Sequence, residues 1–422
     1  MKRLLALALL PGAALAAVIG HNPPAPEMGA ARLAELPAAQ RPAWQAYLDR
    51  SGRQMALDRA TLARELSAGD TVPPPPTPGK MNAPLDREPA WYGTAEAAAI
   101  ADTILSFQTP SGGWSKNQDR RGPKRLPGQR WSNNAETMSV GTGSFDEPRD
   151  RFWTFVGTLD NDATTTELRF LARIQQQRPG PAGDVYRAAI LRGLHYLLMA
   201  QYPNGGWPQV YPLEGGFHDG ITFNDDAVAE AARVLQGVAD GAPEFAFVAE
   251  PLRRQARSAV ARAVDLLLAA QVVVDGRRTI WPQQVDALTL QPISARNYEM
   301  PGLASAESAQ VLVFLMQQPR PTPAVKAAID AGIAWLAAHA LRDHAFTMTP
   351  DGRKLVPQPG AGPLWSRVYD IPTGRPVFGD WGKTIHDDVN EISKGRRNGY
   401  TWWGTWPQKA LDAYPRWQAT HP

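Results

Sequence analysis

The stretch YRAAILRGLHYLLMAQYPNGGWPQVY, residues 186–211, decides the fold that this sequence predicts. Its first part spaces apolar side chains as an amphipathic helix does, and the helical pattern ends at Gln201. A Gly-containing turn follows and leads to Trp207. The Gln side chain can bond free carbonyls at the helix end, while the Trp ring can pack against the next structural unit. This stretch therefore predicts one helical unit of a packed stack.

The same order of helix, Gln, turn and Trp occurs elsewhere in the chain. Residues 95–108 lead to Trp114, and residues 257–271 lead to Trp281 after a longer loop. A further helix of this type is predicted at 325–341, without the Gln–Trp ending. Helical spacing also predicts the partner helices of these units, at 164–177, 225–240 and 305–318.

These units favour an all-α fold, an α/α toroid built of helical hairpins. Strand-like alternation is scarce, and the irregular spacing between the units favours a closed ring over a regular open solenoid. We expect the long loops to gather at one end of the toroid and to form a cleft there. Squalene cyclases and prenyltransferases share the Gln–Trp spacing, so this pattern specifies a fold better than it specifies a reaction.

The first 17 residues, MKRLLALALLPGAALAA, have the features of a signal peptide. A positive start precedes an apolar run at 4–10, and Ala-Leu-Ala at 14–16 is a small-x-small cleavage signal. The apolar run is shorter than the roughly 20 residues that span a bilayer, and no later segment is long and apolar enough to do so. The sequence therefore predicts an exported protein, periplasmic or secreted, that no membrane segment retains.

Residues 18–88 are predicted to form an N-terminal helical extension, and residues 89–422 the toroid. The extension alternates apolar and charged residues at helical spacing over 31–70, which predicts two helices with a break near Pro42. Four consecutive prolines, 73–76, predict a stiff connector between the two parts.

The composition narrows the classes of function. Lys and Arg number 44 against 41 Asp and Glu, and a net charge of +3 suits an acidic ligand but is also usual for a soluble surface. Nothing in the charge pattern indicates nucleic-acid binding, and no oligomerisation signal is present, so we expect a monomer. The absence of Cys excludes disulfides and thiolate metal sites. The 14 Trp residues fit sugar-stacking surfaces and core filling equally well.

Two predicted helices open with dense acidic and amide clusters. These are Asp160-Asn161-Asp162 after a Thr-Leu pair, and Asn224-Asp225-Asp226 after a Thr-Phe pair. One Asp or Asn is enough to cap a helix N-terminus, so two clusters of three exceed that requirement. Grouped hard oxygen ligands are what Ca²⁺ needs, with substrate oxygens completing its coordination shell. We therefore expect at least one acid of each cluster to have a functional role.

Basic residues stand in loops rich in Gly, Pro and aromatic residues. They are Lys116 in GGWSKN, Arg296 in PISARNYEM, Arg367 in PLWSRVY and Arg396 in SKGRRNGY. Solvated loop charges would explain them equally, but the neighbouring aromatic residues offer flat faces for sugars or guanidinium groups: Tyr298, Trp365, Tyr369 and Tyr400. Because Arg binds carboxylates through two parallel hydrogen bonds, these loops suit a uronic acid.

Long phrases of the chain resemble the pectate lyases of polysaccharide lyase family ten. The phrases are QTPSGGWSKN, TLDNDATTTELRFLARI, QYPNGGWPQVYPLEGGFHDGITFNDDAVAE, WPQQVDALTLQPISARNYEMPGLASAESAQVLVFLM and IHDDVNEISKGRRNGYTWW. The resemblance covers essentially the whole toroid part and implies an α/α toroid that cleaves polygalacturonate by Ca²⁺-dependent β-elimination. In such a reaction a base removes the proton at C5, while metal and arginine neutralise the adjacent carboxylate.

The resemblance also implies roles for individual residues. Asp160 and Asp225 match the metal-coordinating positions, and Asn161 matches a substrate-binding one. Arg296 and Arg367 match catalytic arginines of the active centre. The substrate contacts that we expect beside Asn161 are Lys116, Tyr298 and Arg396.

One position departs from the family pattern. The segment Phe378-Gly379-Asp380-Trp381-Gly382-Lys383 places Trp381 where the family's presumed base, an Arg, is expected, and Trp cannot accept a proton. Either Lys383 or Arg296 supplies that function, or a gap displaces the aligned residue. The alternative is a catalytically weakened homologue that binds pectate.

Two other classes of enzyme share parts of the pattern. An isoprenoid-type toroid enzyme is suggested by the Gln–Trp spacing alone, and the export signal and the arginine loops count against it. A glycoside hydrolase would use two carboxylates across the scissile bond, for which Asp160 and Asp225 are available. The arginines would then have no explanation.

Overall fold

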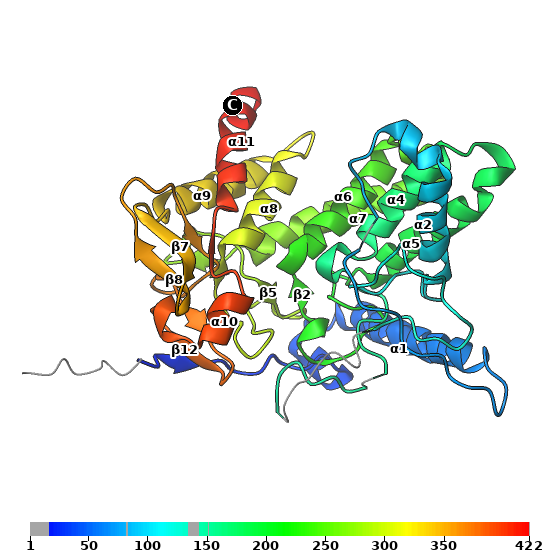
Figure 1. Ribbon diagram of the computed structural model, residues 1–422. Coiled ribbons are helices and arrows are strands. Elements are labelled where there is room, and N and C mark those ends of the chain that lie inside the picture. Colours follow the sequence, from blue (N-terminus) through cyan, green and yellow to red (C-terminus); the bar gives the residue numbers. More distant parts are fainter. Residues whose placement is uncertain (1–16, 82, 134–142, 151, 422) are drawn as a thin grey trace, which may run out of the picture.

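The computed structural model describes residues 17–81, 83–133, 143–150 and 152–421, so the predicted signal sequence up to residue 16 lies outside the described residues. Most of its α-helices pack in two rows, whereas α1 and α10 lie outside them (Figure 1). The bounds are α1 Arg41–Ala63, α2 Ala95–Ser106, α4 Thr165–Gln176, α5 Asp184–Ala200, α6 Ala227–Asp240, α7 Glu250–Ala270, α8 Ser305–Met316, α9 Pro323–Ala338, α10 Lys394–Gly399 and α11 Pro407–Thr420.

Consecutive helices form hairpins, as predicted. Helix α4 packs on α5, α6 on α7, and α8 on α9, while α4, α6 and α8 contact one another in sequence along one row. Helices α5, α7 and α9 form the second row, with α2 against α4 and α11 against α8. The all-α toroid is thus confirmed, but the ring is open, because α2 and α11 stand at opposite ends of the array (Figure 1).

The strands are short and lie mostly in the loops at one end of the helices. Their bounds are β1 Gly20–His21, β2 Ile221–Thr222, β3 Val273–Val274, β4 Arg277–Arg278, β5 Gln284–Val285, β6 Leu303–Ala304, β7 His344–Thr349, β8 Gly352–Pro357, β9 Trp365–Ser366, β10 Val368–Tyr369, β11 Phe378–Gly379, β12 Thr384–His386 and β13 Trp403–Gly404. The longest pair, β7–β8, is an antiparallel hairpin that the sequence analysis missed. Its signal was the Pro-Asp-Gly turn between two alternating segments.

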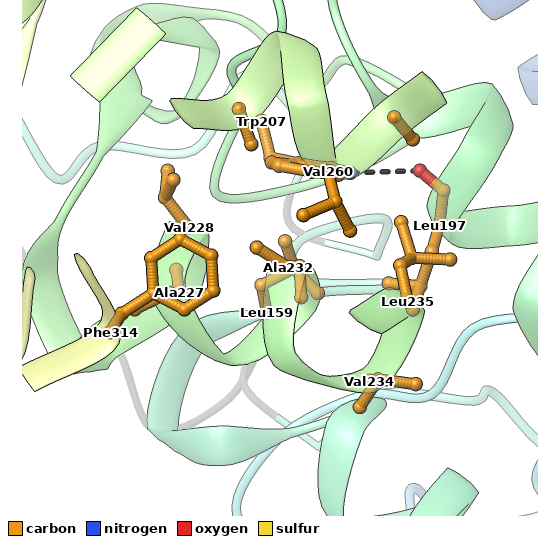
Figure 2. Packing of buried hydrophobic residues seen from close by; sticks show 14 of the residues in the cluster. Leu159, Leu197, Trp207, Ala227, Val228, Ala232, Val234, Leu235, Val260 and Phe314 are labelled. Atoms are coloured by element: carbon orange, nitrogen blue, oxygen red, sulfur yellow. Dashed lines mark hydrogen bonds between the residues drawn. The ribbon is translucent and has the colours of Figure 1, made fainter. Parts of the chain in front are cut away.

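The repeated Trp residues complete the ends of their own helices. The indole N–H of Trp114 donates to the carbonyl of Ile104 at 2.8 Å, near the end of α2. Trp207 does the same for Leu197 of α5, also at 2.8 Å (Figure 2). Trp281 donates to Leu267 near the end of α7 at 2.7 Å. Because the last carbonyls of a helix have no partner within it, a fully buried indole can satisfy one of them.

The Gln residues of the repeat connect neighbouring units. Gln201 donates from one amide group to the Gly205 carbonyl of its own turn and to the Ala259 carbonyl of α7, both at 2.9 Å. Gln108 makes the equivalent pair of bonds, reaching the Ala189 carbonyl of α5. The prediction for Gln was therefore wrong, whereas the Trp114 ring does pack against Gly193 of the next helix, as predicted. The Trp bonds its own helix end, and the Gln bonds the next hairpin.

The unit that ends with α9 also has its Trp. The indole of Trp365 donates to the carbonyl of Leu336 at 2.7 Å, and Trp365 is only 1% exposed. Tyr369 is equally buried, at 2%. The prediction that these two rings face a sugar was wrong, because both belong to the main core. Ten of the fourteen Trp residues are buried, so most of them fill the core.

We expect Trp207→Phe to lower the free energy of unfolding by about 1–3 kcal/mol, because the Leu197 carbonyl then stays buried without a donor. The measurement is urea denaturation followed by circular dichroism. Trp91→Phe is the matched control, since that indole makes only a 3.4 Å bond to the exposed Glu96 and should change stability by about 0.5 kcal/mol or less. Equal losses in both variants would contradict this role for Trp207.

The N-terminal extension packs onto the same core as the toroid. A 3₁₀ helix, η1 (Ala30–Glu35), precedes α1, and Pro42 lies in the first turn of α1, where a missing N–H costs nothing. Pro42 therefore begins a helix. The Tyr47 hydroxyl donates to the Ala200 carbonyl of α5 at 2.9 Å. Among the described residues, no helix is both long and apolar enough to cross a membrane.

Candidate active site

Each acidic cluster follows a buried apolar anchor. Leu159 and Phe223 are both 2% exposed and belong to the main core, which Figure 2 shows around Leu159. The next residue of each cluster donates its backbone N–H to the Thr two positions before it. Asp160 bonds Thr158 Oγ1 at 3.1 Å, and Asn224 bonds Thr222 Oγ1 at 3.2 Å. The two clusters are thus equivalent turns held at the same end of neighbouring hairpins.

The clusters are short 3₁₀ turns, η3 (Asp160–Asp162) and η6 (Asn224–Asp226), with an unusual backbone. Asn161 and Asp225, the central residues, have φ of 51° and 48°. Positive φ costs a non-Gly residue free energy and concentrates at functional sites. The residues that immediately precede α4 and α6, Thr164 and Asp226, make no side-chain cap bond. Capping therefore does not explain these clusters.

Asp160 is buried and paired with a cation. Its Oδ2 forms an ion pair with Lys116, and its Oδ1 accepts a hydrogen bond from Gln209 at 2.8 Å. Burial alone raises the pKa of a carboxyl, but the Lys116 ammonium outweighs it and holds the pKa of Asp160 well below its usual range. The Lys116 ammonium also lies over the Phe155 ring, 3.6 Å from its centre. Asp160 is therefore a fixed negative charge.

Asp225 faces Asp160 from the neighbouring turn. Its Oδ2 accepts bonds from the Asn161 backbone N–H and the Asn224 amide, both at 3.3 Å. Burial, followed by the charge of Asp160, raises the pKa of Asp225 to about 8. The Arg367 guanidinium opposes this shift. Two carboxyl groups that share a buried site cannot both ionise easily unless a cation joins them.

Arg296 stands beside these acids with its side chain 27% exposed. Its Nη1 donates to the Tyr298 hydroxyl at 3.1 Å and lies 3.8 Å from Glu299 Oε1. Its Nε is 3.9 Å from Asp146 Oδ1. The Glu299 carboxylate, with smaller contributions from Asp160 and Asp146, raises the pKa of Arg296 well above its ordinary value. In the free protein Arg296 is thus a cation.

Arg367 is held by two polar side chains. It donates to Glu307 Oε1 at 2.7 Å and to Asn224 Oδ1 at 2.9 Å. Burial by itself lowers the pKa of this guanidinium, but Glu307 outweighs burial and raises it. The guanidinium also lies 4.8 Å from the centre of the Tyr400 ring. Arg367 therefore fixes Asn224, the residue before Asp225.

A hydrogen-bond chain joins the two arginine loops. Tyr400 donates to Glu299 Oε1 at 3.0 Å, and Gln283 donates to the Tyr400 hydroxyl at 3.1 Å. Gln283 also donates to Asn224 Oδ1 at 3.1 Å, where Arg367 bonds as well. The loops that carry Arg296 and Arg367 thus have a fixed relative position.

An open cavity of about 340 Å³ lies between the clusters. Its lining includes Asn161, Asp225 and Arg367, three residues that the sequence selected from three separate segments. Glu307 and Trp406 complete the wall on the other side. The structure therefore brings Asn161, Asp225 and Arg367 to one cavity, whose lining includes neither Asp160 nor Arg296.

Lys383 does not join this group. Its Nζ donates to the Gly143 carbonyl at 2.6 Å and lies 4.5 Å from the centre of the Phe145 ring. The cause is local, because Lys383 has a φ of 63° at the end of a turn and its side chain reaches another loop. These contacts do not support Lys383 as a catalytic group.

Arg396, only 3% exposed, stands in an aromatic cage. Its guanidinium carbon is 3.8 Å from the centre of the Tyr298 ring, 4.5 Å from Trp381 and 5.1 Å from Tyr400. Tyr298 is 5% exposed, so its ring supports Arg296 and Arg396 and presents no open face to a sugar. Trp381 is 55% exposed and covers the cage from outside.

The sequence analysis missed the residues that hold these groups in place. Glu299 and Glu307 fix the two arginines, and Gln209 fixes Asp160. Asn117 accepts a bond from the Asn161 amide at 2.9 Å. Asn117 and Glu299 both lie within quoted motifs, Asn117 directly after Lys116 and Glu299 three positions after Arg296, which is the signal that could have found them.

The loops at one end of this helical toroid thus present paired buried carboxylates and guanidinium groups. The sequence profile described as pectic acid lyase matches residues 108–411. A family 10 polysaccharide lyase from Cellvibrio cellulosa is 32% identical, with a TM-score of 0.64 over 81% of this chain and 99% of the other. An aspartate-to-alanine variant of a family 10 polysaccharide lyase from the same organism, in complex with trigalacturonic acid, is also 32% identical, with a TM-score of 0.65 over 79% and 97%. No curated protein sequence matches the chain.

The chain belongs to the pectic acid lyase family and is a polysaccharide lyase. The resemblance to family ten found in the sequence is thereby confirmed. The matched region begins at residue 108, so the whole N-terminal extension, residues 18–88, precedes it.

Proposed function

We propose that this lyase cleaves polygalacturonate by Ca²⁺-dependent β-elimination at the site between η3 and η6. The observation that carries the proposal is the facing pair Asp160 and Asp225, with Arg296 and Arg367 acting on them electrostatically from either side. An uncharged sugar has no carboxylate for the guanidinium groups to bind, whereas the carboxylate of a uronic acid matches their charge. The trigalacturonic acid bound to a relative supports the same class of substrate.

The two acids fit a divalent cation that they share with the substrate. Among the described residues, no group of three or more His, Asp or Glu side chains forms a complete metal site. Asp160 and Asp225 nevertheless face each other with the like-charge conflict that raises the pKa of Asp225. When bound there, Ca²⁺ would neutralise the substrate carboxylate next to C5 and so acidify the C5 proton.

Arg296 is our candidate for the group that acts at C5. Its guanidinium is partly exposed and acts electrostatically on Asp160, whereas Lys383 is bound to another loop. In β-elimination the base takes the C5 proton, the electron pair forms the C4–C5 double bond, and the C4–oxygen bond to the leaving sugar breaks. The leaving oxygen then takes up a proton. A neutral Arg296 accepts the C5 proton, and in its charged form it binds the carboxylate.

This assignment predicts a rate that rises with pH. Because Glu299, Asp146 and Asp160 raise the pKa of Arg296, the neutral fraction of this group stays small and grows with every step toward alkaline pH. We expect log kcat/KM to rise with a slope of about 1 between about pH 7 and 9, without a plateau. In Arg296→Lys, whose ammonium loses its proton near pH 10.4 in model peptides, the curve should bend at lower pH. A wild-type plateau near neutral pH would assign the proton transfer to another group.

A direct test of the activity follows ultraviolet absorbance of the unsaturated product from polygalacturonate, with Ca²⁺ or with chelator. Absorbance that grows only with Ca²⁺ supports the proposal. Reducing ends without absorbance would indicate a hydrolase. Binding with neither would support the weakened homologue that Trp381 raises as an alternative, since the resemblance leads us to expect the family's base at this exposed position.

We further propose that the enzyme is exported, acts as a monomer and meets its acidic polysaccharide outside the cytoplasm. The signal sequence at residues 1–17 supports export, and a pectic substrate is itself extracellular. N-terminal sequencing of the secreted protein tests this, with a mature start at Ala17 or Val18 as the expected result. A retained Met1 would contradict it.

A further inference from the structure

Residues 19–22 lie against the hairpin β11–β12, which belongs to a distant part of the chain. Strand β1 pairs with β12 in antiparallel register, Gly20 opposite Ile385 and His21 opposite Thr384. The backbone N–H of Asn22 continues the pairing by donating to the Lys383 carbonyl at 2.7 Å. These few residues therefore form the edge strand of a three-stranded sheet.

The side chain of Asn22 points into the loop that carries Arg296. Its amide nitrogen lies 3.0 Å from the Arg296 carbonyl, 3.1 Å from the Asn297 carbonyl and 3.1 Å from the Glu299 carbonyl. Asn22 is only 4% exposed, and its bond to the Glu299 carbonyl is buried, whereas its bonds to the Arg296 and Asn297 carbonyls are partly buried. The two N–H groups of one side-chain amide are thus shared among three carbonyls of a single turn.

The turn itself is closed by bonds that depend on this arrangement. The backbone N–H of Glu299 donates to the Arg296 carbonyl at 2.9 Å, and the Arg296 N–H donates to Glu299 Oε2 at 3.0 Å. The Glu299 carboxylate also raises the pKa of Arg296. A shift of this turn would therefore move the Arg296 guanidinium and its principal carboxylate together.

We propose that residues 19–22 act as a strap that positions Arg296, with Asn22 as the positioning residue. This inference rests on the function proposed for Arg296. The strap belongs to the N-terminal extension and lies before residue 108, where the family match begins. A part of the chain outside the matched region thus completes the site.

The test compares Asn22→Ala with His21→Ala in the otherwise unchanged protein. His21 lies in the same strand, but its side chain is exposed. We expect Asn22→Ala to lower kcat by about 10- to 100-fold, the cost of a misplaced reacting group, with KM within about threefold. Hydrogen exchange of the backbone amides in residues 294–300 should become at least about tenfold faster, because their opening is local. His21→Ala should change none of these quantities.

Each outcome decides the proposal. Wild-type kcat in Asn22→Ala, or exchange that accelerates equally throughout the protein, overturns the strap. If Asn22→Ala does not fold, Asn22→Ser, which keeps one donor, takes its place and is expected to show the same two effects more weakly. If the wild-type protein cleaves no polygalacturonate, the proposed function fails. Faster hydrogen exchange in Asn22→Ala that is confined to residues 294–300 would then still support the strap.

Discussion

Arg296→Ala is expected to lower kcat on polygalacturonate by about a thousandfold, the scale on which charge stabilisation acts in transition states. The melting temperature should change by no more than about 2 °C, because the side chain is 27% exposed, its hydrogen bond is to the neutral Tyr298 hydroxyl, and its ion pairs with Glu299 and Asp146 are long, at 3.8 and 3.9 Å. The carboxylate of Glu299 keeps its bond from Tyr400 in the variant. Initial rates of absorbance increase and a thermal melt measure the two quantities.

The matched control for this prediction is Arg375→Ala. Arg375 is also a loop arginine, but it is exposed and lies outside the hydrogen-bond chain of the site. Its replacement should leave kcat unchanged. If Arg296→Ala retains turnover, or if it melts many degrees lower than the control, Arg296 is not a catalytic residue of the proposed site.

Asp160→Ala should abolish turnover and destabilise the fold by about 3–5 kcal/mol, since it leaves the Lys116 ammonium buried without its partner. The side chains of Lys116 and Asp160 are 7% and 0% exposed, so solvent cannot replace the lost partner. Urea denaturation measures the stability, and the absorbance assay measures the turnover.

The double variant Asp160→Ala with Lys116→Met separates the two roles of the pair. Removing both charges should recover most of the lost stability, because no unpaired charge remains, while activity stays absent. A double variant as unstable as Asp160→Ala alone would show that the pair does not explain the loss. Recovered turnover would remove Asp160 from the site.

The sequence predicted the helical hairpins and the acidic clusters because both are local signals. Apolar spacing in 186–201 is enough to predict helix α5, and a Gly turn is enough to end it. Asp160 and Asp225 were found because each follows an apolar anchor at the start of a predicted helix. The surplus over one capping residue was the informative signal, and the structure shows that capping does not account for it.

The prediction that aromatic residues beside the loop arginines offer ring faces to a sugar was less accurate. Trp365 and Tyr369 stand next to Arg367 in the chain, yet both are buried in the core. Trp365 is needed there to bond the Leu336 carbonyl at the end of α9. Adjacency in the chain does not say which of two neighbouring side chains faces the core, because the intervening turn sets that direction.

The sequence alone determined the hairpin repeat, the family and the residue types that meet at the site. Only the tertiary structure decided their partners: Lys116 lies 44 positions from Asp160, and Asn22 lies 274 positions from Arg296. The physical reason is that helical spacing acts over a few residues. A carboxyl's pKa or a loop's position depends instead on burial and on charges within a few ångströms, whatever their separation along the chain.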